Sequence, residues 1–86
     1  MNNSKLINFT YKDVLTDVDL NTITAIGIYY ATTGLTNSPN TSPWGVLFVL
    51  GRSIEPMYLM QLLIGQYGDI WARRLDKSWK KSSDSN

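Results

Sequence analysis

The chain has 86 residues, of which 43% are hydrophobic and 17% are charged, and its net charge is +1. This length fits one small domain with a thin core, and the apolar content excludes a chain that is disordered throughout. A nucleic-acid partner is not expected, because the net charge is close to zero. Membrane insertion is not expected either, because no apolar run approaches the ~20 residues that span a bilayer. The absence of Cys and His excludes disulfides, thiolate metal sites and the usual general base near neutral pH.

The first 17 residues are predicted to be a lead-in segment. Residues 1–8 are mostly polar, whereas residues 9–15 alternate loosely and fit either a short strand or a helical turn.

One short helix is predicted near the N-terminus. Asp19 suits a helix N-cap, and Leu20 and Ile23 fit one face of a single turn, which Gly27 then ends. The same stretch begins with D-x-D-x-N, the opening of a calcium loop. Thr22 stands where that loop needs Gly, however, and Ile28 stands where it needs Glu, so capping by Asp19 is the better interpretation.

Two strands with a loop between them are predicted next. Residues 27–33 are rich in β-branched and aromatic side chains, and residues 44–51 hold a short apolar run between two glycines. Residues 34–43 contain two prolines, two asparagines and several Ser and Thr, which predicts an irregular loop. Residues 52–56 are expected to form a turn.

The segment from Met57 to Arg74 fits two structures. Pro56 and Gly65 would bound a helix of about two turns, but Gln61 is the one polar residue between 57 and 64, so no amphipathic stripe exists. The glycines of Gly65-Gln-Tyr-Gly-Asp69 fit a hairpin loop. We therefore favour two antiparallel strands over a helix.

The predicted fold class is α+β and mainly β: a small antiparallel sheet of about four strands with one short helix near the N-terminus. One face of the sheet should be packed and the other free. The domain is expected to span residues 18–81, and residues 82–86 form a disordered tail by composition.

Residues suited to catalysis are scarce. Glu55 is the one glutamate, and Asp69 falls in the proposed hairpin turn, where Asp is common for backbone reasons. No nucleophile or phosphate-loop motif occurs. We expect no enzyme, no catalytic residue, no metal site and no cofactor.

Aromatic residues are more suggestive of binding. Tyr29 and Tyr30 must point to opposite faces of a strand, so both cannot lie in the core. If a sugar binds, the predicted contact residues are Trp44, Tyr67 and Trp71, because they lie close to the loop and the turns. The alternative is that the tryptophans, Trp79 included, close the ends of a thin core.

The ordered series Asp19-Leu-Asn-Thr-Ile, Gly27-Ile-Tyr, Asn37-Ser-Pro, Gly45-Val-Leu-Phe-Val, Gln61, Asp69-Ile-Trp-Ala-Arg73 and Trp79 resembles the pyocin-knob family of bacteriophage tail-fibre domains. The resemblance covers roughly residues 18–79. A second closing Trp of the family pattern would fall at Ser82, which opens the Ser-rich tail and fits an end module or a trimmed copy.

This resemblance implies a non-catalytic sheet module of a tail fibre or receptor-binding protein, in the virion, or in the bacterial cytoplasm before assembly if it is prophage-encoded. Its partners would be other subunits or domains of the fibre, in a homotrimer, and a bacterial surface glycan. The alternative is a free-standing phage or bacterial protein that binds and regulates a protein partner through an exposed strand or its basic C-terminal segment.

Overall fold

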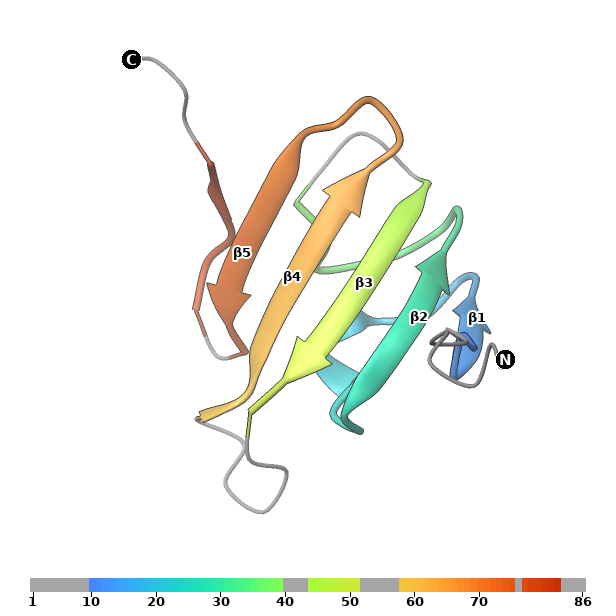
Figure 1. Ribbon diagram of the computed structural model, residues 1–86, viewed down its shortest axis with the longest axis horizontal. Helices are drawn as coiled ribbons and strands as arrows, with labels where there is room; N and C mark the ends of the chain where they lie inside the picture. Colours follow the sequence, from blue (N-terminus) through green and yellow to red (C-terminus); the bar gives the residue numbers. More distant parts are fainter. Residues whose placement is uncertain (1–9, 40–43, 52–57, 76, 83–86) are drawn as a thin grey trace, which may run out of the picture.

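The computed structural model describes residues 10–39, 44–51, 58–75 and 77–82, which form one mixed sheet of six strands in sequence order (Figure 1). The strands are β1 (Asp13–Leu15), β2 (Gly27–Ala31), β3 (Gly45–Leu50), β4 (Met60–Gly65), β5 (Ile70–Arg74) and β6 (Lys80–Lys81). From β2 to β6 each strand is antiparallel to the next, whereas β1 is parallel to β2. The protein is therefore mainly β, as predicted, but its sheet is mixed and has six strands, not about four antiparallel ones.

The two strands that the sequence did not predict lie at the edges of the sheet. β1 has three residues and β6 has two, which is too short for an alternating pattern to be recognised. Short edge strands are common because they limit edge-to-edge association between molecules. β1 lies within the predicted lead-in, where the strand alternative for residues 9–15 is correct at Asp13–Leu15.

The helix predicted near the N-terminus is a single 3-10 turn, η2 (Leu20–Thr22), and not an α-helix. Asp19 caps it as predicted, because its carboxylate accepts a hydrogen bond of 2.8 Å from the Asn21 backbone N–H. The turn ends at Ile23, whose backbone N–H donates to Leu20 O. Among the described residues, no helix is long and apolar enough to cross a membrane.

The predicted reversal at the paired glycines is confirmed. β4 and β5 are antiparallel, with Ile64 opposite Ile70. In the turn between them, Gly65 N donates to Asp69 O and Gly68 N donates to Gly65 O. Gly68 has φ 89°, a left-handed conformation that favours glycine. The predicted turn at 52–56, part of loop 34–43 and most of the tail lie outside the described residues.

Two connections cover one face of the sheet, which we call the inner face. A parallel pair needs a crossover, so residues 16–26 run across this face from β1 to β2. Residues 32–39 return over it, and the two connections pair through hydrogen bonds of 3.0 Å from Leu20 N to Thr36 O and from Thr36 N to Val18 O. In Figure 1 they pass behind the sheet.

The core lies between this cover and the inner face. It consists of Leu15, Leu20, Tyr29, Ala31, Leu47, Val49, Leu59 and Leu63, with Val18, Ile23, Leu35, Trp71, Leu75 and Trp79 packed around them. As predicted, Tyr29 and Tyr30 point to opposite faces: Tyr29 is buried and donates its hydroxyl to Ala25 O, whereas Tyr30 lies on the other face.

Gly45 and Gly65 are paired between β3 and β4 on the inner face. A Cβ at Gly45 would overlap the Ile64 carbonyl oxygen, which is backbone and cannot move aside. A Cβ at Gly27 would instead meet the flexible side chain of Lys12. We expect Gly45→Ala to lower the free energy of unfolding by about 1–3 kcal/mol and Gly27→Ala by less than about 1 kcal/mol. Urea unfolding measures both, and equal losses would contradict this account.

Candidate functional site

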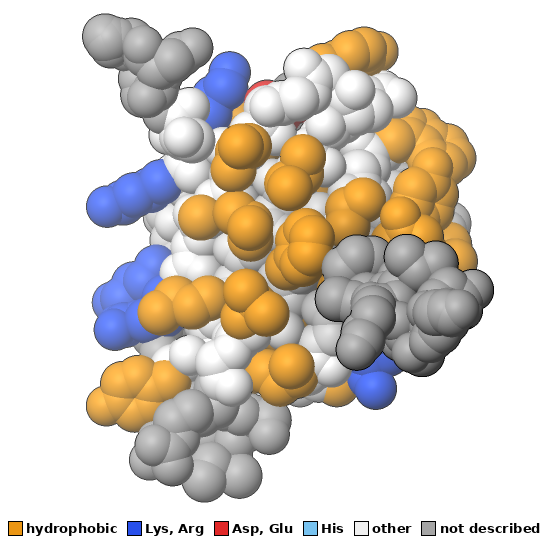
Figure 2. All heavy atoms as spheres, viewed as in Figure 1, with side chains coloured by type: hydrophobic (Ala, Val, Ile, Leu, Met, Phe, Trp, Pro, Cys, Tyr) orange, Lys and Arg blue, Asp and Glu red, His pale blue; other side chains and the backbone are white. Residues whose placement is uncertain are grey.

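The face of the sheet opposite the cover carries almost only apolar side chains, and we call it the outer face. It is formed by Val14, Ile28, Tyr30, Val46, Phe48, Leu50, Met60, Leu62, Ile64, Ile70 and Ala72, with Arg74 at one end of β5. Figure 2 shows many hydrophobic side chains spread over this face, with Lys and Arg side chains mainly along its left margin. No described segment covers it.

Cross-strand register places these side chains in rows. Val46, Ile64 and Ile70 are direct neighbours on β3, β4 and β5, and Phe48 and Leu62 lie opposite each other in the next row. Such cross-strand pairs stabilise a sheet, but the ends of the side chains that point away from the sheet stay exposed to water. Val14 is 57% exposed and Met60 is 46% exposed. A field of this kind marks an interaction surface, because soluble monomers rarely expose large apolar patches.

An aromatic row extends this face at one end. The ring centroids of Tyr11 and Tyr30 are 5.4 Å apart, and those of Tyr30 and Trp44 are 6.0 Å apart, both in tilted arrangements. These distances are typical of favourable aromatic pairs. The row joins β2 to the start of β3.

The three residues predicted to contact a sugar do not form one site. Trp44 belongs to the aromatic row of the outer face, and Tyr67 is 82% exposed at the tip of the β4–β5 turn. Trp71 lies on the inner face, where its ring packs against the core and its indole N–H donates to Asp69 Oδ2 at 2.8 Å. Trp44 and Tyr67 do share one end of the sheet, since Gln66 N donates to Trp44 O.

A polar network that the sequence analysis missed ties the cover to the sheet. It starts at Gln61, which is fully buried on the inner face of β4. Its amide donates to the carbonyls of Leu20 and Ile23, at 2.8 and 3.2 Å, and its oxygen accepts from Arg73 Nε at 2.8 Å. One side chain thus joins the η2 turn to β4 and β5.

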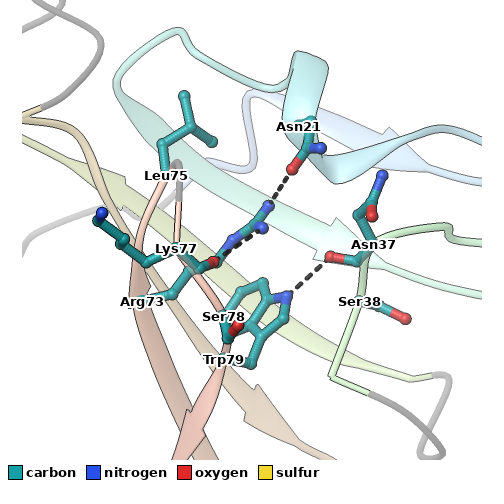
Figure 3. Close-up of a pocket in the computed structure, with 8 residues that line it drawn as sticks. All are labelled: Asn21, Asn37, Ser38, Arg73, Leu75, Lys77, Ser78 and Trp79. Atoms are coloured by element: carbon teal, nitrogen blue, oxygen red, sulfur yellow. Dashed lines mark hydrogen bonds between the residues drawn. The ribbon is translucent and has the colours of Figure 1, made fainter.

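Arg73 continues the network towards the C-terminal segment. Its Nη2 donates to Asn21 Oδ1 at 2.8 Å, its Nη1 donates to Lys77 O at 3.4 Å, and its guanidinium lies 4.7 Å from the centre of the Trp79 ring (Figure 3). Such stacking is a favourable cation–π contact. Burial lowers the pKa of Arg73, and the negative charge of Asp19 opposes that shift.

The network closes through the loop after β2. The Trp79 indole donates to Asn37 O at 2.7 Å, and the Asn37 amide donates to Asp19 Oδ1 at 2.7 Å. Asn37 has φ 56°, a left-handed conformation that Asn tolerates. These bonds to the carboxylate, from Asn37 first and then from Asn21 N, hold the pKa of Asp19 below its ordinary value of 3.8.

An open pocket of about 520 Å³ lies beside this network (Figure 3). It is lined by Asn21, Asn37, Ser38, Arg73, Leu75, Lys77, Ser78 and Trp79. Three segments that are far apart in the sequence supply these residues: the η2 turn, the loop after β2 and the chain from β5 to β6.

One sequence signal pointed to the network. Gln61 interrupts an otherwise apolar run, and a lone polar residue in a buried strand needs partners. The sequence does not give those partners, because Leu20 and Ile23 are 41 and 38 residues from Gln61 and meet it only in the folded chain.

Asp69 does not combine with other acids. Its Oδ2 accepts from Trp71, and its Oδ1 is buried close to Gly65 without a hydrogen-bond partner. Within the ranges that the structure describes, no three Asp or Glu side chains gather in a way that could hold a metal ion.

No protein-family model matches the sequence, and neither a curated protein nor a solved structure matches the chain.

Gln61→Ala should lower the free energy of unfolding by about 2–4 kcal/mol, because it leaves the Ile23 carbonyl and the Arg73 Nε–H without partners, takes one of two donors from the Leu20 carbonyl and opens a cavity in the core. Gln66→Ala is the matched control, since its exposed side chain makes no hydrogen bond among the described residues; its effect should stay below about 0.5 kcal/mol. Urea unfolding followed by tryptophan fluorescence measures both. Similar losses would show that Gln61 does not join the cover to the sheet.

Acid should weaken the network through Asp19. Because its folded-state pKa lies below 3.8, the ionised carboxylate favours the folded chain above that pH, and the contribution is lost as the pH falls through the folded-state pKa. The urea midpoint of Asp19→Asn should therefore lie below that of the unmodified protein at about pH 6, and the gap should narrow at about pH 2.5. Asp13→Asn removes a carboxylate outside the network and serves as the control. A gap that does not change with pH would contradict the role given to Asp19.

Proposed function

We propose that this protein is a non-catalytic structural and host-surface-binding module of a phage or prophage tail fibre or receptor-binding protein, and that it acts as a homotrimer. In this proposal the outer face packs against the outer faces of the other two copies around a threefold axis. The rest of the surface is left to meet other fibre domains and bacterial surface glycan.

The uncovered outer face is the observation that carries the proposal. Five adjacent strands present aliphatic and aromatic side chains, and exposed fractions such as 48% at Leu50 and 39% at Ile70 leave much apolar area in water. Burial of apolar area contributes about 25 cal/mol per Å² towards association, and this contribution has to exceed the entropy that the joined copies lose. The Lys and Arg side chains at the margin (Figure 2) match the polar rim that surrounds the apolar centre of many interfaces.

The polar network contains residues from which the resemblance to the knob family was drawn. Several residues on which the resemblance rests are joined in it by direct contacts: Asp19, Asn21, Asn37, Gln61, Arg73 and Trp79. In this chain they fix the cover on the sheet. A common set of such residues would give a common small scaffold whose other surfaces are free to differ.

The non-catalytic part of the proposal rests on the chemistry of these groups. The network contains one carboxylate, Asp19, which is held by amide and backbone donors. Arg73 is fixed by Gln61, Asn21 and Trp79. Groups held in this way stabilise a structure, and none of them is placed as a general base beside a nucleophile. The proposed location is the virion, or the bacterial cytoplasm before assembly of a prophage-encoded fibre.

Sedimentation equilibrium tests the assembly. The unmodified protein should have the mass of three chains, and Leu62→Arg should convert it to a folded monomer, because a charge at the centre of the outer face cannot be buried unpaired. Thr24→Arg adds the same side chain on the exposed crossover and should leave the trimer intact. A monomeric unmodified protein would overturn the trimer. If that monomer captured a protein partner, the regulatory alternative would be favoured.

A further inference from the structure

The pocket beside Arg73 and Trp79 is rich in unused hydrogen-bond donors. Arg73 has five N–H groups, and three of them donate within the protein, which leaves two with no acceptor among the described residues. The Lys77 ammonium and the Asn21 side-chain amide also make no donor bond there. These groups come from three different segments and line one pocket (Figure 3).

The charged side chains among the described residues that line this pocket, Arg73 and Lys77, are both basic. Arg73 is half-buried and forms no ion pair with a carboxylate in the described part of the chain. Asp19 is the nearest contributor of negative charge, but its Oδ1 already accepts bonds from Asn37 and from Asn21 N. None of the eight lining residues is acidic. An anionic group would thus find charge-assisted donors with no competing carboxylate in the lining.

The remaining lining groups suit hydroxyls. Asn37 Oδ1 has no hydrogen-bond donor among the described residues, and the Ser78 hydroxyl can either donate or accept. Trp79 and Leu75 add apolar surface beside these groups. A volume of about 520 Å³ is within the range of small-molecule sites, and the open shape admits one unit of a longer polymer.

We propose that this pocket binds an acidic saccharide or polyol unit, with its carboxylate or phosphate against Arg73 and Lys77 and its hydroxyls against Asn37, Ser78 and the Asn21 amide. The inference rests on the proposed function and gives the chemical class of its surface glycan. It places glycan contact on the inner side of the domain, at Trp79, and away from Trp44 and Tyr67. The outer face then remains free for assembly.

Isothermal titration of the full chain with three probes tests the site: an oligogalacturonate, its neutral methyl ester and a glycerol-phosphate oligomer. At least one anionic probe should bind, and the neutral ester should not. Binding of the oligogalacturonate would show that the pocket takes a carboxylate, and binding of the glycerol-phosphate oligomer would show that it takes a phosphate. Binding should also shift the NMR signal of the Trp79 indole N–H, which lies at the pocket. Absence of binding by both anionic probes up to about 10 mM would overturn the proposal, as would equal binding of the neutral ester.

Lys77→Glu and Lys80→Glu form a matched pair. Both change the net charge equally and both residues are exposed, but Lys77 lines the pocket whereas Lys80 lies on β6 outside it. Lys77→Glu should weaken binding by about tenfold and Lys80→Glu by less than about twofold, with unchanged urea midpoints for both. Equal losses would mean that only overall charge attracts the probes, and would overturn the site.

The mass of each titrated sample separates this inference from the proposed function. A trimer that binds no anionic probe overturns the pocket assignment and leaves the assembly standing. A monomer that binds an anionic probe at Trp79 supports the pocket and overturns the trimer.

Discussion

The hydrogen bonds of Gln61 are the interaction on which the rest of the structure depends. A single sheet has two faces, and the described residues of this chain cover one of them. Gln61 determines which face that is, because its buried amide binds the η2 turn and its oxygen binds Arg73. A buried polar group without partners is costly. The cover is therefore most stable in the position where the Gln61 side chain keeps its hydrogen bonds.

The same interaction places the other features of the molecule. With the cover fixed on the inner face, Arg73 is held between Asn21 and the Trp79 ring, and the pocket forms at the margin of the cover. The outer face is left with apolar side chains from five strands, and no described segment lies across them. The two proposed surfaces therefore lie on opposite sides of one thin domain.

Part of this arrangement could be predicted from the sequence. The predicted strands at 27–33 and 44–51 hold apolar runs between two glycines, and the hairpin at Gly65–Asp69 has its glycines at the required spacing. These signals are local, so the sequence alone shows them. The predicted sugar contacts were chosen for closeness to turns, and closeness along the chain did not bring them together: Trp44 lies on the outer face and Trp71 on the inner one. The edge strand β6 was missed, and β1 was left open between a strand and a helical turn, because two or three residues show no period.

The sequence by itself determined that the chain is a small, mainly β domain, with a reversal at Gly65–Asp69 and with Tyr29 and Tyr30 on opposite faces. These properties follow from backbone chemistry and from the two-residue period of a strand, both of which act between near neighbours. Only the tertiary structure decided that β1 pairs parallel with β2, and that Gln61, Arg73 and Trp79 meet the η2 turn and the loop after β2. The β1–β2 partners are 16 residues apart, and Gln61 and Trp79 lie 41 and 42 residues from Leu20 and Asn37. The crossover that brings these segments together leaves no local pattern in the sequence.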